Sequence, residues 1–240
     1  MKLKTTLLTI AVMLLASSAF AAIANTKHDL SFFTTAWPAS PSYQTNEAQI
    51  CVFCHTPHGG NLTGPLWNKP VPAAGGFTMY RSTDALKTEL NSVVSVNNES
   101  LLCLSCHDGS IGVNNLLNFG SAPSGQPVVL EFGPGELDIQ GSPGANPRIG
   151  ALTSSDPNGT GHLEDDHPIS LNYSNAVTDN PTGLHTLADA KTAGVQFFPP
   201  NGAANRLECS SCHDVHDNSI PPFLIKDNSG SALCLSCHIK

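Results

Sequence analysis

The stretch Leu-Cys-Leu-Ser-Cys-His stands at residues 102–107 and again, unchanged, at residues 233–238. Two further Cys-x-x-Cys-His units lie at residues 51–55 and 209–213. The chain has eight cysteines, and these four units contain all of them. Two thiols at this spacing can add to the vinyl groups at one edge of a haem, and the next residue then offers its imidazole to the iron. The sequence therefore predicts four covalently attached haem c groups.

The four units also name the residues that would hold the haems. The predicted thioether cysteines are Cys51, Cys54, Cys103, Cys106, Cys209, Cys212, Cys234 and Cys237. The predicted proximal iron ligands are His55, His107, His213 and His238. Zinc ribbons, disulfides and thioredoxin-like redox pairs also use closely spaced cysteines, but none of them explains a histidine after every pair.

The chain contains an internal duplication of a two-haem unit. The first half, about residues 25–120, begins with His-Asp-Leu-Ser at residues 28–31 and continues with two Cys-x-x-Cys-His units. The second half, about residues 160–240, begins with His-Pro-Ile-Ser at residues 167–170 and continues in the same order. A loop rich in Gly and Pro joins the halves, and we expect them to form one tetrahaem domain.

Six histidines lie outside the four units and are candidates for the distal iron ligands. The duplication predicts four of them by pairing positions: His28 with His167, and His58 with His216. His162 and His185 have no counterpart and are reserves. Met79 is the one methionine left after export, so His/Met ligation can serve one haem at most. The alternative role for each candidate is that of a surface histidine that hydrogen-bonds a propionate or a carbonyl group.

His58 carries a further constraint from its spacing. It follows His55 by three residues, so on a helical turn both side chains point to the same side. A distal ligand approaches the iron from the opposite side of the haem. We therefore expect His58 to reach a neighbouring haem, and His216 to do the same in the second half.

The composition predicts little regular secondary structure. The chain has 20 Gly and 18 Pro, whereas only 12% of its residues are charged and 6% are aromatic. Short apolar stretches broken by Gly and Pro bury too little surface to offset the loss of conformational entropy. We predict a mostly irregular multihaem cytochrome fold with haems as its core, short helices around the haem motifs and few or no strands. A helix over residues 82–94 and a short strand over residues 127–132 are the clearest exceptions.

The N-terminal residues have the order of a secretory signal peptide. Lys2 and Lys4 precede an apolar run over residues 7–15, and small residues follow at 16–22. We assign residues 1–24 to the signal peptide and residues 25–240 to the tetrahaem domain. The apolar run is too short to span a membrane, and no later segment is apolar enough. The sequence thus predicts a secreted protein, extracellular or at the cell surface, with the periplasm as the alternative.

The net charge of −8 argues against a nucleic-acid partner, since such proteins need a basic face. No Ser-His-Asp arrangement, phosphate loop or dinucleotide fingerprint occurs, and we predict no catalytic residue.

Three stretches together resemble a known family. They are Cys-x-x-Cys-His-Thr-Pro-His-Gly-Gly at residues 51–60, Leu-Cys-Leu-Ser-Cys-His-Asp-Gly at residues 102–109 and Asp-His-Pro-Ile at residues 166–169. This order resembles the doubled Cys-x-x-Cys-His multihaem cytochromes. Four haems and the Lys-His-Asp-Leu-Ser start are similar to the tetrahaem outer-surface cytochromes of metal-reducing bacteria, of the Omc E type.

The resemblance implies a specific function. Family members polymerise into extracellular conductive filaments, or nanowires, and a distal histidine can come from the adjacent subunit. It implies a filament subunit that delivers electrons to external acceptors such as metal oxides, with copies of itself and redox partner cytochromes as partners. His28 is the candidate for the ligand shared between subunits. A soluble periplasmic electron carrier is the alternative, and a multihaem reductase, which needs an iron with an open coordination position, is less favoured.

Overall fold

The structure is a computed structural model that describes residues 23–31, 44–108, 111, 113, 115–118, 130–131, 149, 162–198 and 205–240. The predicted signal peptide, apart from residues 23 and 24, and most of the loop that joins the halves lie outside the described residues. None of the helices in these ranges is long and apolar enough to cross a membrane.

Regular structure is sparse in the described ranges, as the composition predicted. The α-helices are α2 (Thr88–Ser92), α3 (Asn98–His107), α4 (Tyr173–Asp179) and α5 (Leu187–Thr192). The 3-10 helices are η2 (Cys51–Phe53), η3 (Cys209–Ser211), η4 (Ser229–Ser231) and η5 (Cys234–Ser236). The strands have two residues each: β1 (Gln44–Thr45), β2 (Thr78–Met79), β3 (Leu130–Glu131), β4 (His162–Leu163), β5 (Leu171–Asn172) and β6 (Arg206–Leu207). The predicted fold class, mostly irregular with short helices around the haem motifs, is confirmed.

The helix predicted over residues 82–94 is wrong in its extent, because only α2 forms there. The Ser82 hydroxyl accepts a hydrogen bond from the Asp84 backbone N–H at 3.1 Å, and the Asp84 carboxylate accepts one from the Leu86 N–H at 2.9 Å. Such local side-chain bonds compete with helical hydrogen bonding and favour turns. The strand predicted over residues 127–132 is described at β3 alone, which pairs antiparallel with β1.

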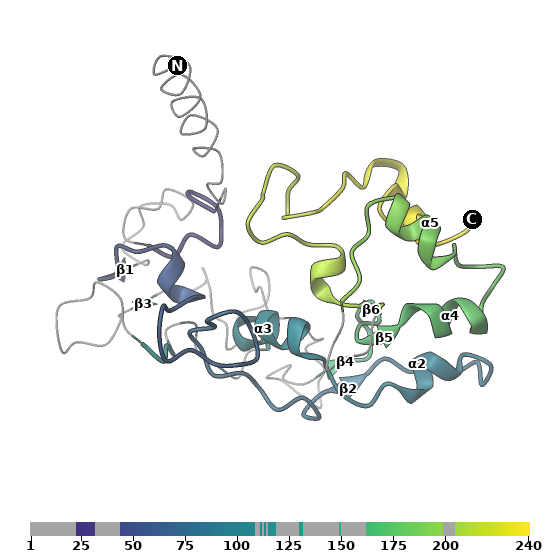
Figure 1. Ribbon diagram of the computed structural model, residues 1–240, viewed down its shortest axis with the longest axis horizontal. Helices are drawn as coiled ribbons and strands as arrows, with labels where there is room; N and C mark the ends of the chain where they lie inside the picture. Colours follow the sequence, from purple (N-terminus) through teal and green to yellow (C-terminus); the bar gives the residue numbers. More distant parts are fainter. Residues whose placement is uncertain are drawn as a thin grey trace, which may run out of the picture.

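The strand pairs connect segments that are far apart in the sequence (Figure 1). Strand β2 of the first half pairs in parallel with β4 of the second half, so that Met79 faces Leu163 in register. Strands β5 and β6 pair antiparallel within the second half. The two halves are therefore joined by backbone hydrogen bonds as well as by side chains.

Helices α2 and α4, one from each half, lie side by side and exchange hydrogen bonds (Figure 1). The Asp179 carboxylate at the end of α4 accepts from the Thr88 hydroxyl at 2.8 Å and from the Glu89 backbone N–H at 2.6 Å. The Glu89 carboxylate in turn accepts from the Asn172 N–H at 2.5 Å. Each helix thus caps the other, which compensates for their short length.

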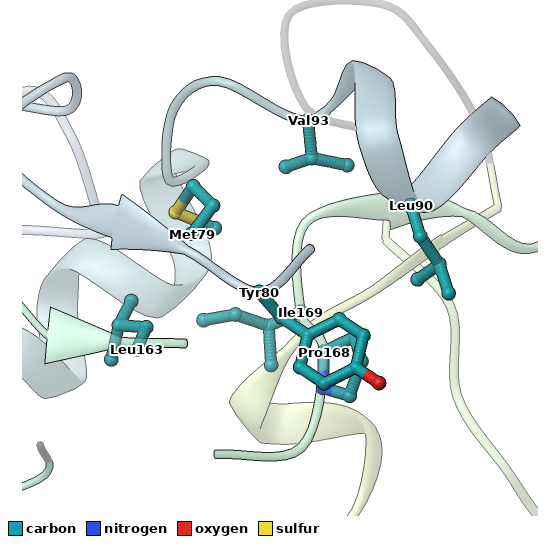
Figure 2. A pocket seen from close by; sticks show the side chains of 7 residues that line it. All are labelled: Met79, Tyr80, Leu90, Val93, Leu163, Pro168 and Ile169. Atoms are coloured by element: carbon teal, nitrogen blue, oxygen red, sulfur yellow. The ribbon is translucent and has the colours of Figure 1, made fainter. Parts of the chain in front are cut away.

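The largest apolar cluster contains buried residues of both halves. Met79, Val93 and Leu104 pack there with Leu171 and Tyr173 from the second half. Figure 2 shows Met79 and Leu163 beside one another at a small cavity of about 10 Å³ in this cluster. Met79, which the sequence left open as a ligand for one haem, is buried in this apolar core with 5% of its surface exposed.

Candidate functional site

Each of the four Cys-x-x-Cys-His units lies on a helical turn. Three of them begin a 3-10 helix at η2, η3 and η5, and the second unit occupies the end of α3. In the three 3-10 units, the first cysteine's carbonyl accepts from the second cysteine's N–H at 3.1–3.2 Å and from the histidine's N–H at 2.8–3.1 Å. Both thiols and the imidazole therefore leave the backbone within one turn, which is the arrangement that haem attachment requires.

After the first unit of each half, a loop folds back and hydrogen-bonds to the backbone of that unit. We call residues 65–69 and 222–226 the return loops. The Asn68 N–H donates to the Cys54 carbonyl at 2.9 Å, and the Ile225 N–H donates to the Cys212 carbonyl at 3.1 Å. The two loops also share an isolated bridge to the unit's histidine, at Trp67 in one and at Leu224 in the other. The duplication therefore extends beyond the residues that identify it in the sequence.

The return loops orient two of the motif histidines. The Nδ1 of His55 is 2.9 Å from the Pro65 carbonyl oxygen, and the Nδ1 of His213 is 3.1 Å from the Pro222 carbonyl oxygen. An imidazole that donates from Nδ1 to a carbonyl leaves its Nε2 lone pair available to a metal. The backbone of each loop thus selects the tautomer that an iron ligand needs.

Three motif histidines each lie near one histidine from outside the units. The ring centroids are 6.2 Å apart for His55 and His216, 6.1 Å for His107 and His28, and 6.3 Å for His238 and His167. A metal–imidazole bond is about 2 Å long and the ring centre lies about 1 Å behind the bonded nitrogen, so a metal held between two imidazoles separates their centroids by about 6 Å. All three separations fit one metal with an imidazole on each side.

The same residues fit a haem iron better than a bare metal ion. A structural zinc ion takes four protein ligands. Within the described ranges, no group of three or more His, Cys, Asp or Glu side chains could hold a metal ion. Two facing imidazoles would be enough to hold a haem iron, because a porphyrin would supply the remaining ligands.

His28 is held by a short turn at the start of the described chain. The Asp29 carboxylate accepts from the Asn25 N–H at 2.8 Å and from the Ser31 hydroxyl at 2.6 Å. The His28 ring also packs on Phe223, with centroids 4.4 Å apart, and its Nδ1 is buried without a hydrogen-bond partner. Burial, followed by the charge of the nearby His107, lowers the pKa of His28 to about 4. The ring is therefore neutral at pH 7, as a metal ligand must be.

The thiols of successive units are close enough to influence each other's pKa. Burial raises the pKa of the Cys54 thiol to about 12, and the neighbouring Cys106 adds to this shift. Burial likewise raises the pKa of the Cys212 thiol to about 11, with Cys237 as the next largest cause.

The contact between the middle two units crosses from one half to the other. The Cys103 side chain is hydrogen-bonded to Cys209, and this contact raises the pKa of Cys103 and lowers that of Cys209. The second and third attachment units are therefore in direct contact across the two halves.

The remaining candidate histidines lie in other surroundings. No ring contact joins His213 to another histidine in the described residues, which include all ten histidines. His58 is exposed. The His162 Nδ1 lies 3.1 Å from the Glu164 carboxylate. His185 is half-buried, and its backbone N–H donates to the Cys237 carbonyl at 2.8 Å.

Sequence reasoning missed two buried charged residues beside the units. Glu208 immediately precedes the third unit and is 1% exposed, and Lys69 is fully buried in the first return loop. The Glu208 carboxylate accepts from the Ser100 hydroxyl at 2.5 Å and from the Asn97 amide at 2.8 Å. The signal available for Lys69 was the Pro-x-x-x-Lys pattern that residues 65–69 share with residues 222–226.

Residues 201–240, which contain the third and fourth units, match the doubled CXXCH motif family. The match indicates a multihaem c-type cytochrome. Such a protein binds haem c covalently through its CXXCH motifs and takes part in electron transfer. A search of the curated proteins found no match to the chain.

Proposed function

We propose that this chain is a secreted electron-transfer protein with four haems, and that it forms a subunit of an extracellular filament that delivers electrons to external acceptors such as metal oxides. The bound haem supplies the one-electron chemistry. The chain supplies attachment, axial ligands and spacing, and it has no catalytic residue. Redox partner cytochromes would exchange electrons with it, and other copies of itself would form the filament.

The observation that carries the electron-transfer proposal is the order of the attachment sites. Cys54 and Cys106 pack against the same small apolar cluster of the first half, and Cys103 contacts Cys209 across the two halves. The Cys212 and Cys237 thiols of the second half are close enough to influence each other through their charges. These observations support a row of four neighbouring sites that runs through both halves. Close spacing of redox centres is what electron hopping requires, and a single-site enzyme has no need of it.

The histidine pairs support six-coordinate iron at three sites. We propose His216, His28 and His167 as the distal ligands that face His55, His107 and His238. Because His216 of the second half pairs with His55 of the first, the duplication assigns His58 to the iron of His213. The pairing of His28 with His107 in one chain favours His28 as a ligand within its own subunit, in place of the shared ligand that the resemblance implies.

Ligand substitution tests these assignments. In the ferric protein, His28→Ala, His167→Ala and His216→Ala should each convert one of four haems from low-spin to high-spin iron while all four stay attached. His58→Ala should do the same for the fourth. His185→Ala is the matched control and should leave all four low-spin. An unchanged spectrum in the first three variants would contradict the axial assignment.

Filament formation requires a separate test. Electron microscopy of the secreted fraction should show thin unbranched filaments. Monomers alone at high concentration would favour a soluble periplasmic carrier. A high-spin fraction in the wild-type protein at neutral pH would favour a reductase with an open coordination position.

A further inference from the structure

Lys69 is a buried cation next to the first two attachment sites. Its side chain is 0% exposed, and its Nζ donates to the backbone carbonyls of Val113 at 2.9 Å and Asn115 at 3.2 Å. Burying an ammonium group is costly, because water no longer solvates its charge. Because the chain has few charged residues and this one is fully buried, packing alone does not explain a lysine at position 69.

The groups around Lys69 belong to the first two units. Burial lowers the pKa of Lys69, while the neighbouring Cys106, Cys54 and Asp108 act to raise it. Cys54 and Cys106 both pack against the small core cluster that also contains Val113. The ammonium group therefore lies beside both attachment sites of the first half, and the Asp108 carboxylate offsets part of its charge.

The second half repeats this arrangement at Lys226. Lys226 ends the second return loop, as Lys69 ends the first. Its Nζ donates to the Ser236 hydroxyl at 3.0 Å and to the Ala193 carbonyl at 3.4 Å. Ser236 lies between Cys234 and Cys237 of the fourth unit. Each lysine thus runs from the loop after one attachment unit to a position beside the next unit, although Lys226 is only half-buried.

The two loops match in conformation as well as in sequence position. Leu66 and Phe223, three residues before each lysine, both have positive φ, of 56° and 60°. The N–H of Thr56 donates to the Leu66 carbonyl and that of Asp214 to the Phe223 carbonyl, both at 2.8 Å. Lys69 and Lys226 are therefore equivalent positions of the duplicated unit.

We propose that Lys69 and Lys226 are a duplicated pair of electrostatic residues that raise the reduction potentials of the haems attached beside them. This inference rests on the proposed function. Reduction adds an electron to the haem, so a nearby positive charge stabilises the reduced form. Charge, burial and hydrogen bonding near the iron are among the means by which a protein sets a haem potential. The deeper Lys69 should have the larger effect.

The size of the effect follows from electrostatics. A unit charge about 10 Å from an iron, at an effective dielectric constant of about 20, changes the reduction equilibrium roughly tenfold. For a one-electron couple, a tenfold change is about 59 mV. Lys69→Met should therefore shift the reduction equilibrium of at least one haem about tenfold towards the oxidised form, which lowers its reduction potential. Lys226→Met should shift the equilibrium about threefold in the same direction, because water screens its half-exposed charge.

Spectroelectrochemical titration of the purified holoprotein tests the proposal. Lys191→Met is the matched control, because Lys191 is exposed and its Nζ donates to the Asn205 side chain at 3.0 Å, outside the attachment units. Intact mass should show four haems in every variant. The expected result is a fall in potential for Lys69→Met and Lys226→Met and no change for Lys191→Met.

Each outcome decides one question. Unchanged potentials in Lys69→Met and Lys226→Met with four haems attached would overturn this inference and leave the proposed function standing. Should Lys69→Met fail to fold, Lys226→Met alone decides the sign of the effect. Fewer than four haems in the wild-type protein would instead count against the proposed function.

Discussion

Glu208 connects the two halves at the scale of a single residue. Its carboxylate accepts hydrogen bonds from Ser100 in α3, from Asn97 just before α3, and from Ser170 of the second half at 3.1 Å. Burial raises the pKa of Glu208, although these hydrogen bonds act to lower it. The carboxyl group thus sits where its charge is costly and its hydrogen bonds are satisfied.

Glu208→Gln should reduce the dependence of stability on pH. An unfolded glutamate titrates near 4.3, and the folded state has the higher pKa, so between these values the folded state binds more protons. The contribution of Glu208 to the free energy of unfolding therefore falls as the pH rises through this window. The contribution stays low at higher pH. Relative to wild type, Glu208→Gln should gain stability as the pH rises above the unfolded value of about 4.3.

Denaturant unfolding over this pH range measures the difference. Asp227→Asn, which changes an exposed carboxylate, is the control and should run parallel to wild type. A difference between Glu208→Gln and wild type that is constant with pH would show that Glu208 is not perturbed by burial.

The return loops matter at the scale of elements, since each one holds the backbone after a motif histidine in place. Leu66 and Phe223 adopt the left-handed conformation at equivalent positions, and a residue with a side chain pays for this conformation. Their surroundings differ, however. Leu66 is 54% exposed, whereas Phe223 is 8% exposed and packs on His28.

The same substitution should therefore have opposite effects in the two loops. Leu66→Gly should raise the free energy of unfolding by up to about 1 kcal/mol, because it relieves the left-handed strain and loses little burial. Phe223→Gly should lower it by about 3 kcal/mol, because the lost packing outweighs the relieved strain. The midpoint of urea unfolding reports both. Equal changes in the two variants would contradict the claim that the different burial of Leu66 and Phe223 decides the sign of the effect.

At the scale of the whole molecule, the two halves depend on one another. His55 of the first half lies against His216 of the second, and Cys103 contacts Cys209 across the same boundary. The shared apolar cluster and the bonds between α2 and α4 hold this boundary together. If His216 is the distal ligand at the His55 site, as proposed, the first half is incomplete without the second.

Separate expression of the halves tests this dependence. Residues 25–120 should attach two haems, but the haem on His55 should be high-spin without His216. Addition of residues 160–240 should restore low-spin iron. A first half that is fully low-spin by itself would show that its distal ligands all lie within it.

The sequence predicted the features that rest on local chemistry. The four units, the duplication and the low content of regular structure follow from residue types and spacing, and the last of these is confirmed. The sequence did not indicate that His216 faces His55, because that contact depends on how the halves pack. The sequence also overestimated the length of the helix at residues 82–94, where Ser82 and Asp84 form turns. It gave Lys69 no role, because the burial of a side chain depends on tertiary contacts.

The central claim is that every Cys-x-x-Cys-His unit holds one haem through two thioether bonds. Intact mass of the purified mature chain, measured under denaturing and reducing conditions, tests it most directly. We predict the mass of the polypeptide plus four haems, and the loss of one haem when Cys51 and Cys54 are both changed to Ala. A wild-type chain carrying fewer than four haems would contradict the account.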